Sequence, residues 1–250
     1  MTVPKIFLHG VPDSPAIWRP LLAALALGDT PASAPSLPGF TAPLPAGFVP
    51  TKESYAAWAI VEVERMFAMH GPVDIIGHDW GALIAQRVAM LRPDLIRSWV
   101  ASNAVIDPEY RGHRVARLWN TPVLGEIFMA LSRPAALARG LAENGVPADI
   151  AEEEASQWRR KDKRRAILKL YRSAKGLNFE HDWARDLHRL PTNGALIWGV
   201  NDPYVDLSVA QRFAKDQGTL LTIIEGTGHW AIAERPEAVA AALQFFWKEH

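Results

Sequence analysis

Hydrophobic residues along the chain occur in two patterns: short, mainly apolar runs and longer stretches with helical spacing. Mainly apolar runs at residues 4–8, 73–77, 96–102, 194–199 and 220–224 predict buried strands. Between them, apolar positions recur every three or four residues, which is typical of amphipathic helices. These helices are predicted at residues 16–27, 53–70, 82–91, 207–216 and 236–248. The alternation predicts an α/β fold with a mostly parallel, doubly wound sheet.

A sixth strand is predicted at residues 30–35, where it must lie at the edge of the sheet. This segment carries Pro31 and Pro35. Because proline has no N–H to donate to a strand ladder, it is tolerated at an edge and not in the middle of a sheet. We therefore predict about six main strands.

Residues 104–190 do not follow the alternation. Their pattern is helical throughout, with breaks at Pro122, Pro134, Gly145 and Pro147, and no convincing strand. The simplest interpretation is a helical insertion into one α/β core. The predicted organisation is a core formed by residues 1–103 and 191–250, with residues 104–190 as a helical cap or lid.

A charged run inside the insertion has two interpretations. Acidic residues at 152–154 precede a basic stretch at 159–165. Acids early and bases late suit the dipole of a helix. We therefore interpret the run as a solvated outer face and prefer this to a nucleic-acid patch.

The composition limits the partners of the chain. The sequence has 250 residues, 49% of them hydrophobic, with a formal net charge of zero. There is thus no overall field that would attract nucleic acid or an anionic membrane, and a small neutral or apolar organic substrate is the easier match. The absence of cysteine excludes disulfides, thiolate catalysis and cysteine metal sites. With no leader segment or long apolar run, we expect a cytoplasmic protein.

Candidate chemistry begins with Asp79, which two glycines bracket. Gly77 and Gly81 stand two residues before and after it, directly behind the strand at residues 73–77. This is the G-x-nucleophile-x-G pattern of a sharp strand-to-helix turn, in which the central side chain is exposed above the sheet. A carboxylate there is already anionic at neutral pH and needs no base to act as a nucleophile. The alternative is that Asp79 only caps the following helix.

Asp202 and His229 also follow predicted strands. Because parallel strands present their carboxyl ends at one edge of the sheet, we expect both near Asp79. The chain order of nucleophile, acid and histidine is that of the α/β-hydrolase arrangement. Alternatively, Asp202 starts a turn and His229 is an ordinary loop residue. Asp107, after the preceding strand, is the other available acid, but we consider Asp202 the better choice.

Three motifs carry a family resemblance. The elbow from Gly77 to Ala85, the His9-Gly-Val-Pro12 loop, and Gly228-His-Trp230 followed by Glu234-Arg-Pro-Glu237 resemble those of epoxide hydrolases in the α/β-hydrolase superfamily. The resemblance covers most of the core and weakens in the insertion. The chain departs from the family in starting at the strand that ends in His9-Gly10, without the usual N-terminal β-hairpin. Another subunit could cap the shortened sheet, so a homodimer is a possible assembly.

The resemblance implies a two-step mechanism. Asp79 attacks an sp3 carbon and forms an alkyl ester. His229, supported by Asp202, then takes a proton from the water that attacks the ester carbonyl, and activity should fall in acid as His229 protonates. The backbone N–H groups of Val11 and Trp80 would form the oxyanion hole. No metal or organic cofactor is required.

The resemblance also indicates which residues would assist the leaving oxygen. Epoxide hydrolases use two lid tyrosines as acids. The run Lys169-Leu-Tyr-Arg172 is similar to the second tyrosine motif and places Tyr171 in the role. Where the first tyrosine is expected, Leu118 stands. Tyr110, about two helical turns earlier, would substitute for it if it faces the cavity; otherwise it is a packing residue.

Dehalogenation by the same nucleophile is the alternative function. Haloalkane dehalogenases also carry an Asp-Trp elbow, with the indole N–H as a halide ligand. Trp80 would take this role with a second donor such as Trp119, Trp158 or Trp183, although Val11 replaces the asparagine that some of these enzymes use. Fluoroacetate dehalogenases bind the carboxylate of their substrate with two arginines. Trp80 and Leu83 stand at those positions here, so a fluoroacetate substrate is disfavoured.

Two further functions are weaker. A non-catalytic ligand binder on this fold would be free to lose one of the three groups, yet Asp79, Asp202 and His229 are all present. An ordinary esterase would need the serine that Asp79 replaces.

Overall fold

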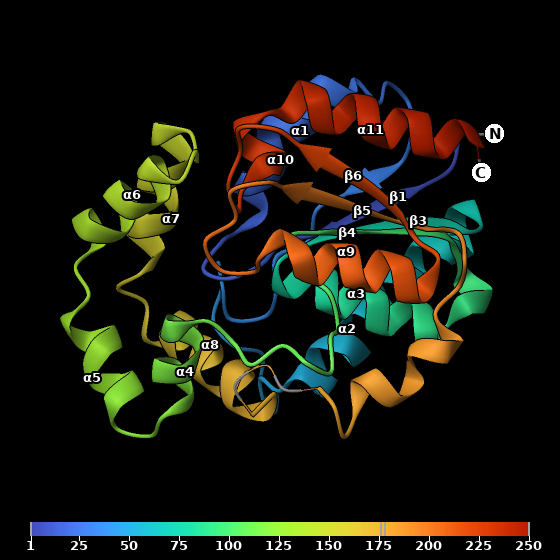
Figure 1. The fold of residues 1–250 in the computed structure, drawn as a ribbon. Coiled ribbons are helices and arrows are strands. Elements are labelled where there is room, and N and C mark those ends of the chain that lie inside the picture. Colours follow the sequence, from blue (N-terminus) through green and yellow to red (C-terminus); the bar gives the residue numbers. More distant parts are fainter. Residues whose placement is uncertain (1, 176, 178, 250) are drawn as a thin grey trace.

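The computed structural model describes residues 2–175, 177 and 179–249, and its centre is one parallel sheet (Figure 1). The sheet has six strands in the order β2-β1-β3-β4-β5-β6, and every neighbouring pair is parallel. The strands are β1 (Lys5–Leu8), β2 (Ala32–Ser33), β3 (Val73–His78), β4 (Ile96–Ser102), β5 (Gly194–Gly199) and β6 (Leu220–Ile224). The predicted sheet and the edge position of the proline-flanked strand are confirmed.

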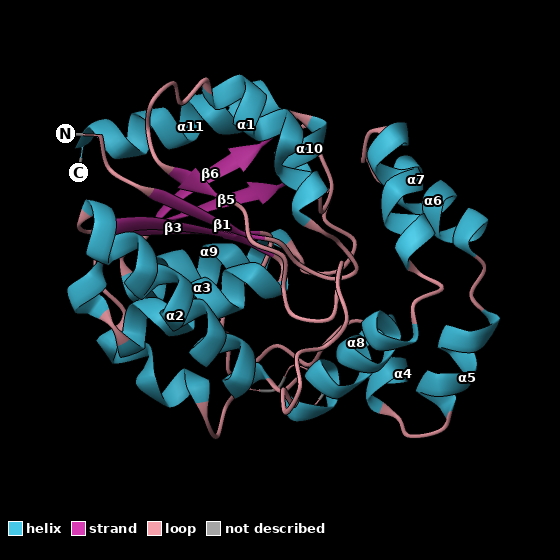
Figure 2. Ribbon diagram, turned by 180° about the vertical axis from the view of Figure 1, so that it is seen from behind, coloured by secondary structure: helices cyan, strands magenta, loops and turns pink. Residues whose placement is uncertain are grey.

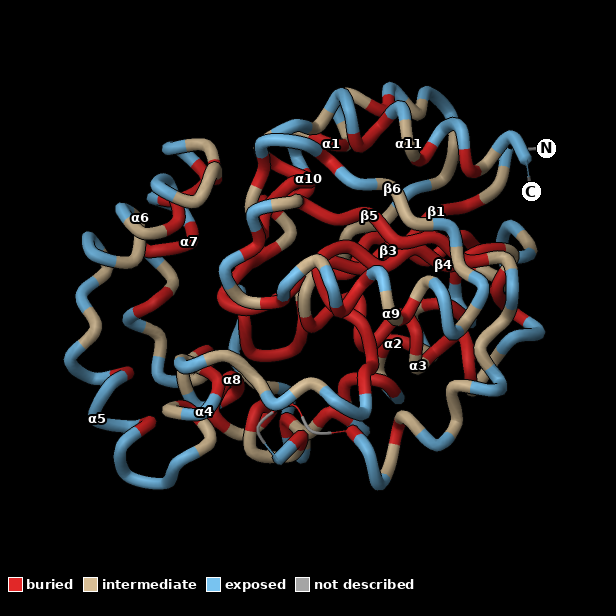
Figure 3. Tube along the Cα trace, in the orientation of Figure 1, coloured by how far each residue is buried: buried red, intermediate tan, exposed pale blue. Residues whose placement is uncertain are grey.

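Helices cover both faces of the sheet. Helices α1 and α11 lie on one face, and α2, α3 and α9 on the other (Figures 1 and 2). Their bounds are α1 (Arg19–Leu25), α2 (Lys52–His70), α3 (Trp80–Leu91), α9 (Leu207–Gln217), α10 (Ala231–Glu234) and α11 (Pro236–Glu249). Strands β1, β3 and β5 are buried along their whole length (Figure 3), as their mainly apolar runs predict. Strand β6 was also predicted to be buried, but it lies at the other edge of the sheet and its residues are mostly intermediate or exposed.

Two local predictions are corrected. The helix predicted at residues 16–27 is a 3-10 turn, η1 (Pro15–Trp18), followed by α1, which ends where Ala26 adopts φ +46°. Pro20 falls near the start of α1, where its missing N–H costs nothing, so the helix begins there. The short α10 was not predicted because four residues are too few for a periodic pattern.

Five α-helices separate β4 from β5 and lie beyond the carboxyl ends of the strands (Figure 1). They are α4 (Arg114–Asn120), α5 (Leu124–Leu131), α6 (Pro134–Glu143), α7 (Ala148–Gln157) and α8 (Lys161–Ser173), followed by the 3-10 helix η3 (Trp183–Arg189). Within the described part of residues 104–190 no strand forms. We call this segment the insertion.

Buried charges attach the insertion to the sheet. Glu154 of α7 and Lys163 of α8 form an ion pair at 3.2 Å, and both side chains are fully buried. The hydroxyl of Ser14, in the loop after β1, donates a hydrogen bond to Glu154. A solvated face was predicted here, and for these two residues that prediction is wrong. Because a buried charge needs its partner, this pair fixes α7 and α8 relative to the loop after β1.

In the described part of the chain, no helix is both long and apolar enough to cross a bilayer.

Candidate active site

Asp79 stands at the corner between β3 and α3 in a strained conformation. Its backbone has φ +52° and ψ −123°, and its side chain makes no capping hydrogen bond to the helix. A Cβ on Gly77 would lie 2.2 Å from the carbonyl oxygen of Gly81, and one on Gly81 would lie 1.9 Å from that of Leu8. Glycine is therefore required on both sides for helix and strand to approach. The capping interpretation of Asp79 is wrong, and the sharp turn is confirmed.

The carboxylate of Asp79 is held by groups that favour its anion. Its Oδ1 accepts a hydrogen bond of 2.8 Å from the backbone N–H of Val11, and its Oδ2 is 3.5 Å from Nε2 of His229. Burial by itself would raise the pKa of Asp79, but His229 and the backbone N–H of Trp80 outweigh burial and lower it. The residue is thus ionised at neutral pH, with the N–H of Val11 bonded to it and the N–H of Trp80 close enough to lower its pKa.

His229 connects Asp79 to Asp202. Its Nδ1 donates a hydrogen bond of 2.8 Å to Oδ2 of Asp202, which leaves Nε2 facing Asp79. Burial would lower the pKa of His229, yet the two carboxylates outweigh it and raise that pKa to about 10. The imidazole is therefore protonated at neutral pH while Asp79 is a free carboxylate.

Asp202 both stabilises a backbone turn and holds His229. Its Oδ1 accepts hydrogen bonds from the backbone N–H groups of Tyr204 and Val205, which is the turn that sequence reasoning offered as the alternative. Its Oδ2 binds His229. The other candidate acid, Asp107, is engaged elsewhere: it pairs with Arg212 and accepts hydrogen bonds from the backbone of Glu109 and Tyr110.

Asn103 is a further support that sequence reasoning missed. It follows β4, has φ +56°, and donates a hydrogen bond of 2.8 Å to Oδ2 of Asp202. Asp202 thus has both oxygens fully engaged, which fixes its orientation toward His229. The signal in the sequence was a polar residue directly after a buried strand.

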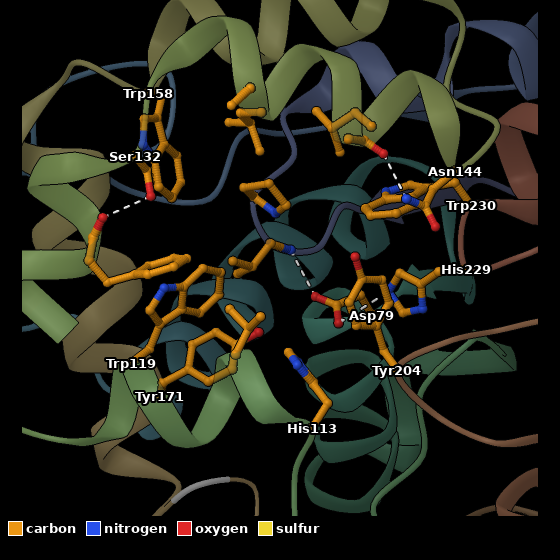
Figure 4. Close-up of a pocket in the computed structure, with 18 of the residues that line it drawn as sticks. Asp79, His113, Trp119, Ser132, Asn144, Trp158, Tyr171, Tyr204, His229 and Trp230 are labelled. Carbon is orange, nitrogen blue, oxygen red and sulfur yellow. Dashed lines mark hydrogen bonds and ion pairs between the residues drawn. The ribbon is translucent and has the colours of Figure 1, made fainter. Parts of the chain in front are cut away.

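A cavity of about 440 Å³ opens between Asp79 and the insertion (Figure 4). Its walls are mainly apolar and aromatic, which suits a small organic molecule. Asp79 and His229 lie at one end, and Ser132 of the insertion lies at the other (Figure 4). The core loops supply Val11, Pro12, Tyr204 and Trp230, and the insertion supplies His113, Trp119, Phe128, Leu137, Trp158 and Tyr171, among others.

This fold and site match a known family. The model of the alpha/beta hydrolase family matches residues 6–242. The chain belongs to the alpha/beta hydrolase family. The predicted fold class is thereby confirmed.

Relatives of this hydrolase have different substrates. An (E)-2-((N-methylformamido)methylene)succinate hydrolase of Acinetobacter baylyi is 23% identical over 245 residues, covering 96% of this chain and 89% of the relative. Epoxide hydrolase 2 of Siraitia grosvenorii is 36% identical over 101 residues, covering 38% of this chain and 30% of the relative. The structure of an epoxide hydrolase from Vigna radiata aligns with a TM-score of 0.80 at 18% identity, covering 100% of this chain and 92% of the other. At that identity the alignment shows a shared fold.

Tyr171 of the hydrolase is placed as predicted. It lies on α8, is buried, and lines the cavity; its ring meets that of Trp80 edge-on, with 5.4 Å between centroids. Burial and the charge of Asp79 raise the pKa of Tyr171 well above its ordinary value, so its hydroxyl keeps its proton. A protonated phenol is a hydrogen-bond donor for a developing oxyanion.

Two other residues predicted to assist the leaving group, Tyr110 and Trp119, lie near the site with their donor groups turned to other partners or directions. Tyr110 lines the smaller pocket beside Asp79 and not the 440 Å³ cavity, and it donates its hydroxyl hydrogen to the carbonyl of Tyr204 at 2.8 Å. Trp119 lines the cavity, but its indole nitrogen is on the side away from Asp79 (Figure 4). In this arrangement the hydroxyl hydrogen of Tyr110 is already used and the indole N–H of Trp119 is turned away, so the roles predicted for both stay predictions.

Of the other tryptophans considered as halide ligands, two line a pocket and one does not. Trp158 lines the cavity wall on the insertion side, whereas Trp183 stacks on Phe179 outside the cavity lining. Trp80 lines a smaller pocket beside Asp79, and its buried indole N–H has no hydrogen-bond partner in the described part of the chain.

Two cavity residues were missed by sequence reasoning. Tyr204, two residues after Asp202, has its ring 5.0 Å from those of both His229 and His113 and its hydroxyl directed into the cavity (Figure 4). His113 caps α4: its Nδ1 accepts the backbone N–H of Ala116 at 3.3 Å, so a neutral ring carries its proton on Nε2. Burial lowers the pKa of His113 to about 4, which keeps the ring neutral. Both side chains are therefore donors beside Asp79.

Two further histidines near the site are neutral. His9 bridges loops, with Nδ1 2.9 Å from the carbonyl of Gly10 and Nε2 accepting the N–H of Leu37 at 3.0 Å. His78 differs, because both its ring nitrogens lack a hydrogen-bond partner among the described residues. Burial lowers the pKa of each to about 3.

Proposed function

We propose that this hydrolase opens epoxides to vicinal diols through an ester on Asp79. One observation carries the proposal: a carboxylate, not a hydroxyl, occupies the strained corner, within reach of a His229–Asp202 pair and at the end of an apolar cavity. The 36% identity of one segment to an epoxide hydrolase adds support. The carboxylate also argues against acyl transfer, which would use a serine.

In the first step, Asp79 attacks one epoxide carbon. Its Oδ2 forms a C–O bond to that carbon while the C–O bond to the epoxide oxygen breaks, and the oxygen takes the electron pair. Tyr171 transfers its phenol proton to this oxygen, which becomes the free hydroxyl of the Asp79 ester, while Tyr204 and the Nε2–H of His113 donate hydrogen bonds to it. The Tyr171 phenolate then regains a proton from water. Since Oδ1 stays bonded to the N–H of Val11, the nucleophile is held in one orientation.

In the second step, water releases the diol. His229 accepts a proton from water, whose oxygen adds to the carbonyl carbon of Asp79. The N–H groups of Val11 and Trp80 stabilise the oxyanion that forms. As this intermediate collapses, His229 returns its proton to the departing oxygen and the diol is released. The new carboxylic acid of Asp79, which holds one oxygen from water, then loses its proton and becomes the carboxylate again.

The two steps should differ in their dependence on pH. The lowered pKa of Asp79 keeps the nucleophile ionised, so ester formation should be flat across about pH 5 to 8. Esterification removes the negative charge of Asp79, one cause of the raised pKa of His229, and so lowers that pKa below about 10. Ester breakdown needs the neutral ring and should slow in acid about tenfold per pH unit below the new pKa.

Single-turnover kinetics would separate the two rates. An acid loss confined to ester formation would contradict this assignment.

Tyr171 and Tyr110 form a matched pair of variants. Tyr171→Phe should lower the rate of epoxide opening by about 100-fold or more, because one donor to the leaving oxygen is lost. Tyr110→Phe removes a hydroxyl that is bonded to the Tyr204 carbonyl and should cost about 1 kcal/mol of stability with little change in rate. Rapid-quench rates with styrene oxide, together with thermal melts, would compare them. Equal loss of rate in both would refute the role given to Tyr171.

The covalent route has a direct test. After one turnover in water enriched in heavy oxygen, mass spectrometry of the peptide that carries Asp79 should show heavy oxygen in its carboxylate. Incorporation into the diol alone, under demonstrated turnover, would show that water attacks the epoxide directly and would refute the ester.

Hydrolytic dehalogenation is a second candidate, favoured by one observation. The indole N–H of Trp80 is buried next to Asp79 without a hydrogen-bond partner in the described chain, and a halide leaving group would accept from it. Parallel assays with styrene oxide and a bromoalkane, following diol and bromide release, would separate the two activities. Bromide release without diol formation would reverse our preference.

A further inference from the structure

The loop that carries His229 is closed by the side chain of Glu234. Helix α10 begins at Ala231, two residues after the histidine, and ends at Glu234. From there the carboxylate reaches back along the chain, and its Oε2 accepts a hydrogen bond of 3.0 Å from the backbone N–H of Gly228. Glu234 belongs to a motif of the family resemblance, yet neither step of the proposed reaction uses it. Residues 228–234 thus form a ring that contains His229.

This hydrogen bond anchors the residue directly before His229. On the sheet side, the hydroxyl of Thr227 donates to a carbonyl of β6 at 2.9 Å, and the carbonyl of Thr227 accepts the N–H of Asn201 at 2.9 Å. These bonds hold the loop as far as Thr227. Gly228 has no side chain with which to hold its own backbone, and glycine has more backbone freedom than any other residue. The contact with Glu234 therefore restricts the backbone at the point where His229 is attached.

The position of His229 has to be precise. Its Nδ1 binds Asp202 at 2.8 Å, and its Nε2 is 3.5 Å from Asp79, so the attacking water has to fit against Nε2 and the ester carbonyl at once. A displacement of about 1 Å can lower the rate of such a step by about 100-fold. An anchor on the loop therefore bears on ester hydrolysis, in which His229 is the base. Ester formation uses the carboxylate of Asp79 and depends on the loop much less.

Glu234 also contacts the insertion. Gly145 lies in the turn between α6 and α7 with φ +89°, and a Cβ there would lie 2.5 Å from Cδ of Glu234. Leu141 before this turn and Val146 after it are buried in the same apolar cluster as Trp230. In both overall views α10 is the core helix that faces this end of the insertion (Figures 1 and 2). The turn therefore packs on Glu234 and limits where its carboxylate can lie.

The same turn forms part of the cavity wall. Asn144, directly before Gly145, lines the cavity and lies beside Trp230, at the end that contains His229 (Figure 4). The residue that faces a bound substrate and the residue that packs on Glu234 are thus neighbours in the chain. The cavity wall and the His229 loop therefore share one support.

We propose that Glu234 is a positioning residue for ester hydrolysis: it holds the His229 loop, and the turn at Gly145 holds Glu234 in place. This inference rests on the proposed function, in which His229 is the base of the second step. The role needs an acceptor oxygen and not a negative charge, because the partner is a backbone N–H. Glutamine should therefore replace Glu234, and alanine should not.

Single-turnover kinetics with styrene oxide tests the role of the side chain. Glu234→Ala should slow ester hydrolysis by about 10- to 100-fold with little change in ester formation, so the ester accumulates. Glu234→Gln should hydrolyse the ester nearly as fast as the unchanged protein. Glu225→Ala is the matched control, because Glu225 is exposed in the same loop, and it should slow neither step. A merely structural role would lower stability in a thermal melt without separating the two steps.

Gly145→Ala tests the contact from the insertion side. The added methyl group would occupy the place of the Glu234 carboxylate and displace it, so ester hydrolysis should slow as it does in Glu234→Ala. Gly47→Ala is the control for backbone strain, since Gly47 has φ +78° with nothing within 4 Å of the added Cβ. Gly47→Ala should slow neither step. Added to Glu234→Ala, the Gly145→Ala change should slow ester hydrolysis no further, because the carboxylate it displaces is already gone.

Proton NMR of the substrate-free protein reports on His229 directly. The proton on Nδ1, bonded to Asp202 at 2.8 Å, should give a resolved downfield signal. Glu234→Ala and Gly145→Ala should shift this signal or broaden it by exchange with water. Glu234→Gln, Glu225→Ala and Gly47→Ala should leave it in place.

The outcomes separate this inference from the proposed function. An unchanged His229 signal in Glu234→Ala, equal slowing of both steps, or failure of Glu234→Gln to restore hydrolysis would overturn the positioning role. If Glu234→Ala does not fold, Gly145→Ala with its Gly47→Ala control tests the same contact. A changed His229 signal in a protein that opens no epoxide would refute only the proposed function.

Discussion

Replacing Asp79 with Asn should abolish epoxide turnover, with a loss of about 10⁴-fold or more. The amide has the same shape and can accept the N–H of Val11, but it lacks the anionic oxygen that attacks carbon. The chain should still fold, since φ +52° is tolerated by Asn at least as well as by Asp. Steady-state diol formation and a thermal melt would measure both effects.

Asp206→Asn is the matched control. Asp206 is exposed and its Oδ1 accepts the N–H of Ser208 at the start of α9, away from the cavity. This variant should keep its rate. Substantial activity in Asp79→Asn that persists in freshly purified protein would remove Asp79 from the mechanism and leave the cavity with a binding role or with a different nucleophile.

Replacing His229 with Gln should trap the ester. Alkylation uses the carboxylate of Asp79 and can proceed, whereas hydrolysis loses its base, so turnover should fall by about 10³-fold or more. Intact-protein mass spectrometry after mixing with excess epoxide should show a gain equal to the mass of the substrate. In the unchanged protein the ester should be short-lived.

His188→Gln controls for the loss of an imidazole. His188 is exposed on η3, with Nδ1 3.0 Å from the carbonyl of Arg185, and does not line the cavity. It should neither slow turnover nor retain substrate mass. If His229→Gln turns over slowly without any mass gain, then His229 acts before the covalent bond forms, and the proposed order of steps is wrong.

The order of helices and strands could be predicted from the sequence because burial and backbone geometry depend on residues close together in the chain. Strands β4, β5 and β6 have the predicted bounds, and α3 begins at Trp80, directly after the glycine-bracketed Asp79. A strand buried on both faces needs a continuous apolar run, and a sharp turn needs glycine, so neither depends on distant residues. Both features were therefore visible in the sequence.

The direction in which side chains of the insertion point could not be predicted from the sequence. Tyr110 and Trp119 have the right chemistry, but one hydroxyl is bonded to the Tyr204 carbonyl and one indole nitrogen points away from Asp79. Tyr204 and His113, which no motif singled out, face the cavity instead. Orientation depends on how α4 and α8 are packed over the sheet, and helical spacing does not report the angle of that packing.

By itself, the sequence determined the parallel sheet, the strained corner at Asp79 and the carboxyl-end positions of Asp202 and His229, because strand periodicity and glycine geometry act over a few residues. The tertiary structure alone decided which donors meet Asp79 and that Glu154 and Lys163 are buried together. Each of these depends on contacts between residues far apart in the chain, whose geometry only the packed molecule specifies.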